Sequence, residues 1–333
     1  MKIQEFRDLL KGADRERLEK AFSECYKQFS KAKKEEIDDL VRDILSGGEE
    51  NSRKKDTTAD FAALEREVVL FVENAYAQNY LVPNRSVSKS QRPKWRFLVM
   101  NSIKELNAIP PESEFFERAV QCLWELYGVL CQGCNVYLFS SDDPFASVRW
   151  KQPELFHLLV KKTFLLGYTE ENIKKVVQAS STGGLSRTSL YVMNQMALLS
   201  ELKTSDVKYI AIEAAKEQIE TLRSQKTKSN RSSSDYYREE KINNLCGLVL
   251  LIYITLAEAG EGIQYFFSRC EETNKEFVLY EALDYAAWME DEQVWIDFYH
   301  YGLKKKIKPR DSLRKKYEEL MMKKICPLEE ESV

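Results

Sequence analysis

An uninterrupted apolar segment, LCGLVLLIYITLA at residues 245–257, constrains the fold of this chain more than any other feature. The segment is shorter than the roughly 20 residues that a helix needs to cross a bilayer. Its apolar residues cover every side of a helical projection, which is typical of a helix surrounded by other elements. We therefore expect a buried helix at the centre of the C-terminal half and no membrane-spanning segment.

Residues that interrupt helices are scarce in the rest of the chain. The 333 residues include only 12 glycines and 8 prolines, whereas 31% are charged. This combination favours long helices joined by short turns. The chain is also longer than one compact core usually allows, so two domains or one elongated array are expected. The predicted fold class is all-α: a multi-helix array or bundle, irregular and α-solenoid-like, with an N-terminal helical appendage.

Shifts in composition divide the chain into segments. Two stretches, GGEENSRKKDTT at 47–58 and the uniformly polar residues 225–234, have almost nothing to bury. We expect an N-terminal helical segment at 1–46, a linker at 47–58, a central helical domain at 59–224, a flexible linker or loop at 225–234, and a C-terminal helical segment at 235–333 that packs on the central domain.

Apolar residues recur with helical spacing through most of the sequence. Residues 3–46 read as short amphipathic helices, one of them capped by Asp14 and carrying Leu18, Phe22, Tyr26 and Phe29 on one stripe. Further helices are expected at 59–80, 94–108, 112–132, 153–166, 170–178, 186–202, 205–224, 235–259, 262–270, 275–289, 292–301 and 310–324.

Charge and cysteine content bear on partners and compartment. The 50 basic and 53 acidic residues leave a net charge of -3, which gives no overall attraction to nucleic acids or acidic membranes. The seven cysteines are odd in number and scattered, which is typical of reduced thiols in the cytoplasm. The charged first residues lack the apolar core of a signal peptide. We expect a cytoplasmic protein that needs no cofactor.

Each of the two histidines follows an acid by three positions: Glu154 precedes His157, and Asp297 precedes His300. An acid and a histidine at this spacing share one helix face, and such pairs build the carboxylate di-metal sites of four-helix bundles. Helical projections, however, place His157 on the polar side of its helix and His300 nearly opposite the apolar stripe. We therefore expect both histidines to face water rather than a metal.

A carboxylate and histidine metal enzyme is kept as an alternative. Glu125 and Glu258 would supply the additional acids, because both lie within strongly apolar helices. The sequence contains no G-x-S-x-G elbow, dinucleotide fingerprint, kinase signature or H-E-x-x-H motif. Carboxylates alone can catalyse, so enzymatic activity stays open, but the sequence favours a non-catalytic protein.

The motif CQGC, residues 131–134, raises the question of redox or zinc chemistry. A C-x-x-C pair has its most reactive thiol at a helix N-terminus, whereas this motif follows an apolar helix that Gly133 is expected to end. The helix dipole would therefore raise the pKa of the thiols. Since no second such motif completes a zinc site, we interpret Cys131 and Cys134 as packed or partly exposed thiols.

Two basic stretches are candidate nucleic-acid contacts. In residues 84–97, Arg92, Lys94 and Arg96 surround Trp95 with no acid among them, so they could bind phosphates beside a stacking indole. A second basic stretch covers residues 302–316. An ordinary solvated loop with Trp95 packed inward is the preferred interpretation of the first stretch. Nucleic-acid binding would require both stretches to share one surface.

Two further motifs are weaker candidates. In SSTGGLSRTS, residues 180–189, Gly183 and Gly184 precede a helix that Ser186 could cap, and an ordinary turn is preferred over an anion site. Trp288 and Trp295 are seven residues apart and belong to an aromatic stripe. Such a stripe usually packs in the core, and it would be a binding surface only if partly exposed.

We expect this chain to be a binding or scaffold protein. It would engage another macromolecule, most simply another protein, through a groove or aromatic patch.

Overall fold

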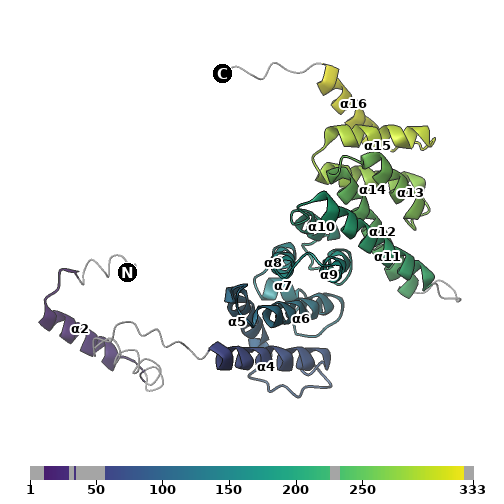
Figure 1. Cartoon of the computed structure of the whole chain (residues 1–333). Coiled ribbons are helices and arrows are strands. Elements are labelled where there is room, and N and C mark those ends of the chain that lie inside the picture. Colours follow the sequence, from purple (N-terminus) through teal and green to yellow (C-terminus); the bar gives the residue numbers. More distant parts are fainter. Residues whose placement is uncertain (1–10, 30–33, 35–56, 226–232, 326–333) are drawn as a thin grey trace. The chain divides into compact units, whose positions relative to one another are not determined.

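The computed structural model describes residues 11–29, 34, 57–225 and 233–325. All regular secondary structure within these residues is helical (Figure 1), so the predicted all-α class is confirmed. The chain divides into two units, residues 1–60 and 61–333. Most of the two expected linkers, residues 47–56 and 226–232, lies outside the described residues.

The first unit contains helix α2, Arg15–Lys27. Asp14 caps it as predicted, because the Asp14 carboxylate accepts a hydrogen bond from the backbone nitrogen of Arg17 at 2.8 Å. None of the residues of α2 is buried, and Phe22 is 48% exposed. The other helices expected within 3–46 lie outside the described residues.

The second unit is a succession of helices, each packed mainly on helices near it in sequence. α5 contacts α6, α9 contacts α11, and α14 contacts α15 (Figure 1). This pattern is typical of solenoid-like arrays. The elements are α4 Thr57–Tyr76, η1 Arg92–Lys94, α5 Trp95–Ala108, α6 Phe116–Asn135, α7 Pro144–Ser147, α8 Gln152–Leu165, α9 Glu170–Ser181, α10 Tyr191–Leu199, α11 Ser205–Ser224, α12 Ser233–Thr255, α13 Ala259–Arg269, α14 Lys275–Trp288, α15 Glu292–Lys304 and α16 Asp311–Ile325.

Helix α12 forms the centre of the C-terminal half, as its sequence predicts. The four consecutive residues 248–251 point to different sides of the helix, and all have no solvent exposure. The surrounding helices are α9, α10, α11, α13 and α14. Burial of an all-round apolar helix is favourable because roughly 25 cal/mol is gained per Å² of apolar surface removed from water. Within the described residues, no helix is both long and apolar enough to cross a membrane.

Some helix ends differ from the predicted ones. α4 ends at Tyr76 rather than residue 80, and Gln78 in the following turn adopts a left-handed φ of 55°. α6 continues past Gly133 to Asn135, so Gly133 does not end the helix. Its missing side chain instead accommodates the ring of Pro144, whose Cγ would lie 2.8 Å from an added Cβ. Packing between helices therefore explains Gly133 better than a helix stop.

The predicted start of α10 was also wrong. The helix begins at Tyr191 and not at residue 186, and Ser186 does not cap it. The backbone nitrogen of Ser186 donates to the Gln152 side chain at 2.7 Å, and its hydroxyl donates to Asp143 at 2.7 Å. These distant partners hold residues 182–190 as a loop between α9 and α10.

Candidate functional site

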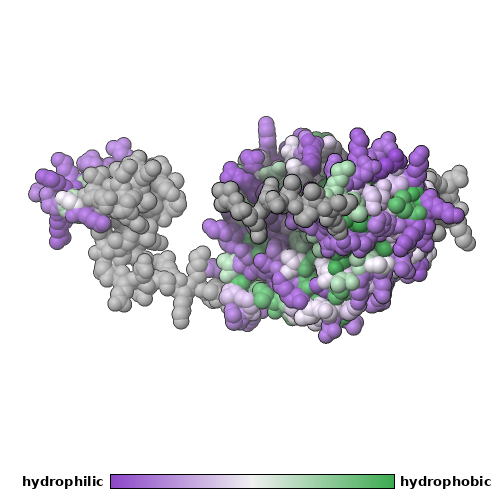
Figure 2. Space-filling view, turned by 90° about the horizontal axis from the view of Figure 1, so that it is seen from above, coloured by the Kyte–Doolittle hydropathy of each residue, from purple (hydrophilic) through white to green (hydrophobic). Residues whose placement is uncertain are grey.

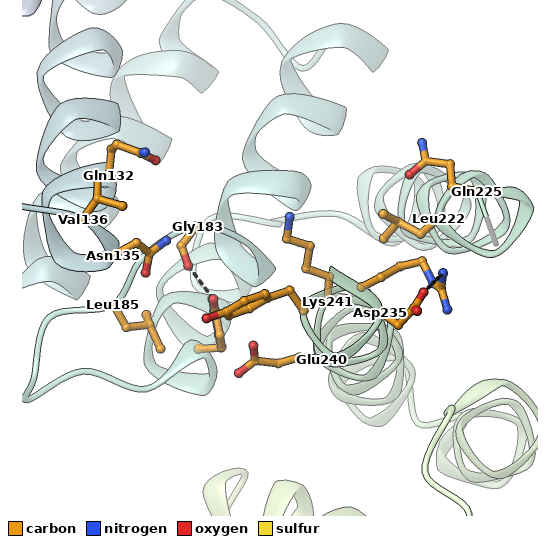
Figure 3. A pocket seen from close by; sticks show the side chains of 13 residues that line it. Gln132, Asn135, Val136, Gly183, Leu185, Leu222, Gln225, Asp235, Glu240 and Lys241 are labelled. Atoms are coloured by element: carbon orange, nitrogen blue, oxygen red, sulfur yellow. Dashed lines mark hydrogen bonds and ion pairs between the residues drawn. The ribbon is translucent and has the colours of Figure 1, made fainter. Parts of the chain in front are cut away.

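A hollow lies between the C-terminal end of α6 and the N-terminal part of α12. Its volume is about 950 Å³. Figure 3 shows Gln132 and Asn135 of α6 on one side, Leu222 and Gln225 of the α11 end on the other, and Lys241 of α12 between them. The loop between α9 and α10 contributes Gly183 to the wall.

A second, smaller hollow of about 330 Å³ adjoins the first. It runs between α6 and α9 and is lined in part by Gln178 and Lys175. Gln132, Asn135 and Gly183 line both hollows, so the two are adjacent. We call the combined cavity the α6 groove.

Buried Gln152, at the start of α8, fixes the loop that forms one wall of this groove. Its side chain is 1% exposed. The amide nitrogen donates to the backbone oxygen of Gly184 at 3.0 Å and to the hydroxyl of Tyr127 at 3.3 Å, while the amide oxygen accepts from the backbone nitrogen of Ser186 at 2.7 Å. The nitrogen and the oxygen of one carboxamide thus supply hydrogen bonds that the loop backbone would otherwise lack.

The two glycines of the loop are required for different structural reasons. Gly183 adopts a φ of +102°, which residues with a Cβ rarely adopt. Gly184 lies against α6, where a Cβ would come within 2.0 Å of the backbone oxygen of Cys131. The loop can therefore pack directly on the α6 backbone, with Tyr191 donating from its hydroxyl to the Gly183 oxygen at 2.5 Å. Burial raises the pKa of Tyr191 to about 12, so this hydroxyl remains a donor at neutral pH.

Asp143 holds the far end of the same loop. One carboxylate oxygen accepts from the Ser186 hydroxyl at 2.7 Å and from the Arg187 backbone nitrogen at 3.1 Å, and the other caps α7 through the nitrogen of Ala146 at 3.2 Å. Charge-assisted hydrogen bonds of this kind are among the stronger ones in proteins. The groove wall is consequently preformed.

Uncommitted side-chain amides are the main chemical feature of the groove. Gln132, Asn135, Gln178 and Gln225 are all exposed, and none of these side chains makes a hydrogen bond within the described residues. Each carboxamide offers two donor hydrogens and an acceptor oxygen. The groove can thus satisfy a ligand that carries both donors and acceptors along its length.

The charged groups of the groove have mixed sign. Arg238 pairs with Asp235 at 2.8 Å (Figure 3), and its Nε, which is buried, has no hydrogen-bond partner among the described residues. Lys241 and Glu240 line the same cavity without an ion pair in the described part of the chain. No strong field of one sign results, so an uncharged or zwitterionic ligand suits the groove better than a polyanion.

Cys131 of the CQGC motif lines the groove, and the pKa values of both thiols of the motif are raised. Cys131 is buried, and burial raises its pKa to about 12; burial, with a smaller contribution from Asp143, also raises the pKa of Cys134 to about 12. The sequence predicted a raised pKa from the helix dipole, whereas removal from water is the main cause here. Both thiols stay protonated at neutral pH, where the thiol is a poor nucleophile.

The two histidine side chains are less exposed to solvent than the helical projections predicted, because both contact other side chains. His157 Nε2 is 2.7 Å from Glu201 Oε1 and 3.1 Å from the Ser200 hydroxyl. His300 is half-buried, with Nε2 2.9 Å from the hydroxyl of Tyr317 on α16. Contacts with neighbouring helices, which a single-helix projection omits, account for the difference.

The four acids considered for a metal site form hydrogen bonds or ion pairs with other side chains. Glu154 pairs with Lys151 at 3.1 Å, Asp297 accepts from Gln293 at 2.7 Å, and Glu125 accepts from Gln121 at 3.1 Å. Glu258 accepts from the hydroxyl of Tyr209 at 2.5 Å. Among the described residues, no three His, Cys, Asp or Glu side chains come together in an arrangement that could hold a metal ion.

The aromatic stripe is largely part of the core. Trp295 is 2% exposed and stacks on Tyr299 with ring centroids 5.7 Å apart. Trp288 is half-buried against the same core. On the face shown in Figure 2, hydrophobic residues form small patches among hydrophilic ones. Scattered apolar residues of this kind are ordinary on protein surfaces.

The structure brings together only part of the predicted basic residues. Arg92, Arg96 and Trp95 line one pocket near η1, whereas Lys94 is exposed outside it. The indole of Trp95 is buried and stacks on Phe139 at 4.1 Å. The second basic stretch, 302–316, belongs to α15 and α16, toward the opposite end of the array from α5 (Figure 1).

Sequence reasoning missed the residues that shape the α6 groove, namely Gln152, Gln178 and Gln225. A glutamine at the start of an otherwise apolar helix is the only signal for Gln152, and it does not reveal which backbone the amide will contact.

Comparison of the chain with protein-family models, with curated proteins and with solved structures gave no match.

Proposed function

We propose that this protein is a non-catalytic binding protein that holds an extended segment of another polypeptide in the α6 groove. The observation that carries the proposal is the set of exposed, unpaired carboxamides that line the groove at Gln132, Asn135, Gln178 and Gln225. A polypeptide in extended conformation presents unpaired N–H and C=O groups along its length. A carboxamide has the same pair of functions and can bond to either.

Apolar and charged positions between the amides would select side chains of the bound segment. Val136, Leu185 and Leu222 offer apolar contacts in the main hollow. Lys241 and Glu240 offer one charge of each sign. Main-chain hydrogen bonds would supply sequence-independent affinity and these positions would supply specificity, as in other modes of extended-peptide recognition.

The rigidity of the groove supports the same proposal. The wall formed by residues 182–190 is held by Gln152 and Asp143, so it requires little ordering when a ligand binds. A preformed site loses less entropy on association and binds more tightly for the same contacts. Arrays of stacked helices commonly use such concave surfaces for binding, although fold alone does not fix function.

Selection from a library of random linear peptides, displayed on phage and panned against the full chain, tests the proposal. The best peptides would be synthesised and their affinities measured by isothermal titration calorimetry. Gln132→Ala removes one amide of the groove, and Asn101→Ala removes an exposed amide on α5 away from it. We expect Gln132→Ala to weaken binding about three- to tenfold, since a hydrogen bond contributes about 0.5–1.5 kcal/mol.

Two results would contradict the proposal. One is a selection in which no peptide is enriched. The other is equal affinity for the native protein, Gln132→Ala and Asn101→Ala, which would place the peptide outside the groove.

A further inference from the structure

Three arginines before and within the first turn of α5 line a separate pocket of about 360 Å³. They are Arg85, Arg92 and Arg96, and the lining also includes Ser140, which follows α6, and Ser147 of α7. We call this cavity the arginine pocket. It shares no lining residue with the α6 groove.

The three guanidinium groups are not neutralised by the protein. No carboxylate pairs with Arg85, Arg92 or Arg96 among the described residues. Arg92 donates from Nε to the backbone oxygen of Val87 at 2.9 Å, which leaves its terminal nitrogens free, and Arg96 lies over the ring of Phe97. Three positive charges at one pocket without a counter-charge repel one another unless an anion binds.

The nearest acids in sequence on the serine-bearing segment are engaged elsewhere. Asp142 pairs with Arg187 at 3.4 Å, and Asp143 accepts from Ser186 and from the Arg187 backbone. These contacts belong to the wall of the α6 groove. The arginine pocket therefore keeps its full positive charge.

The floor of the arginine pocket is aromatic and buried. Trp95 stacks on Phe139 at 4.1 Å, and Tyr80 meets Phe139 edge-on at 5.3 Å. Tyr80 is 9% exposed, lines the pocket, and its hydroxyl has no hydrogen-bond partner within the described residues. Burial raises the pKa of Tyr80 to about 12, so the hydroxyl is a donor at neutral pH. The hydroxyl is not among the buried, unpaired side-chain atoms of the described residues, so it is accessible to a ligand in the pocket.

The geometry points to a binding site for a phosphate monoester in the arginine pocket. A monoester carries nearly two negative charges at neutral pH and three terminal oxygens, which matches three guanidinium groups and neighbouring hydroxyl donors. Guanidinium is well suited to this role because it binds phosphate oxygens in pairs. A phosphodiester fits less well, since it carries a single negative charge and only two terminal oxygens.

Calorimetric titration of the full chain with O-phosphotyrosine, O-phosphoserine and inorganic phosphate tests the site, with dimethyl phosphate as the diester. Arg85→Gln with Arg96→Gln removes two pocket charges and leaves Arg92 to hold the loop. Lys89→Gln with Lys94→Gln removes two exposed charges from the same loop that do not line the pocket. Thermal unfolding would verify that both double variants remain folded.

We expect the monoesters to bind, with the arginine double variant weakening them at least about tenfold and the lysine double variant less than about twofold. Preference for phosphotyrosine or phosphoserine over inorganic phosphate would identify the source as a modified side chain, and equal binding would identify the free ion. Absence of binding up to about 10 mM, equal losses in the two double variants, or binding of dimethyl phosphate as tight as that of the monoesters would each overturn the inference.

Discussion

The side-chain oxygen of Gln152 lies 2.7 Å from the backbone nitrogen of Ser186, 34 residues further along the chain. The amide nitrogen of the same side chain reaches the Gly184 oxygen at 3.0 Å. One buried carboxamide therefore ties the start of α8 to the loop that forms a wall of the α6 groove. The shape of the groove depends on this contact.

Replacement of Gln152 by methionine keeps the length of the side chain and removes its hydrogen bonds. We expect Gln152→Met to lower the free energy of unfolding by about 2–4 kcal/mol, because two backbone groups are left buried and unpaired. Urea denaturation followed by circular dichroism measures this change. A loss below about 0.5 kcal/mol would show that the loop finds other partners.

A side chain at Gly184 should disrupt the same wall. Its Cβ would lie 2.0 Å from the Cys131 backbone oxygen, and backbone atoms cannot move aside cheaply. We expect Gly184→Ala to destabilise the protein by about 2–4 kcal/mol. Gly260→Ala is the matched control, since nothing lies within 4 Å of an added Cβ there and alanine favours the helix. Similar midpoints for both variants in thermal unfolding would refute the close packing of the loop on α6.

Glu281 on α14 should make stability depend on pH. Burial, aided by Glu272 and Asp284, raises its pKa from 4.5 to about 7. The folded state thus holds a proton that the unfolded state releases, and stability must fall as pH rises from about 4.5 to 7. Glu281→Gln should remove this fall and stabilise the protein at pH 8 by about 1–2 kcal/mol, given partial screening by solvent.

Unfolding free energies of the native protein and Glu281→Gln at pH 5 and pH 8 check this expectation. Glu105→Gln, which changes an exposed carboxylate on α5, serves as the control. If Glu281→Gln and Glu105→Gln follow the same pH dependence as the native protein, the proton is held elsewhere.

Removal of both histidines should leave the metal content unchanged. His157 is bonded to Glu201 and Ser200, and His300 to Tyr317, so neither is grouped with the acid that precedes it by three residues. Elemental analysis by mass spectrometry of protein purified without chelators or a polyhistidine tag should give the same sub-stoichiometric metal in the native and His157→Ala, His300→Ala proteins. About one equivalent that is lost in the double variant would restore the metal-enzyme alternative.

The periodicity of apolar residues was sufficient to predict most helices. Residues 205–224 are bounded on both sides by polar turns, and the predicted ends agree with α11. The apolar run of α12 likewise identified the buried centre of the C-terminal half. These features are local, because the repeat that defines a helix is contained within the helix itself.

The groove was not predictable in the same way. Ser186 has the sequence context of a helix cap, but its actual partners, Gln152 and Asp143, are 34 and 43 residues away. His300 looked exposed on its own helix and is covered by Tyr317 of the next one. The amides of Gln132 and Gln178 remain unpaired because of the way α6 and α9 pack. Such contacts depend on tertiary structure, which local patterns do not encode.

Two adjacent tyrosines of α12 allow a direct test of the groove. Tyr237 is 61% exposed and lines the groove, whereas Tyr236 is 65% exposed and does not line it. A photoreactive benzoylphenylalanine at either position keeps an aromatic side chain and reports what lies beside it. The measurement is photo-crosslinking of a library-selected peptide to each of the two modified proteins. A polypeptide held in the α6 groove should crosslink at position 237 and at most weakly at position 236, whereas equal crosslinking at both positions, or none at 237, would contradict groove binding.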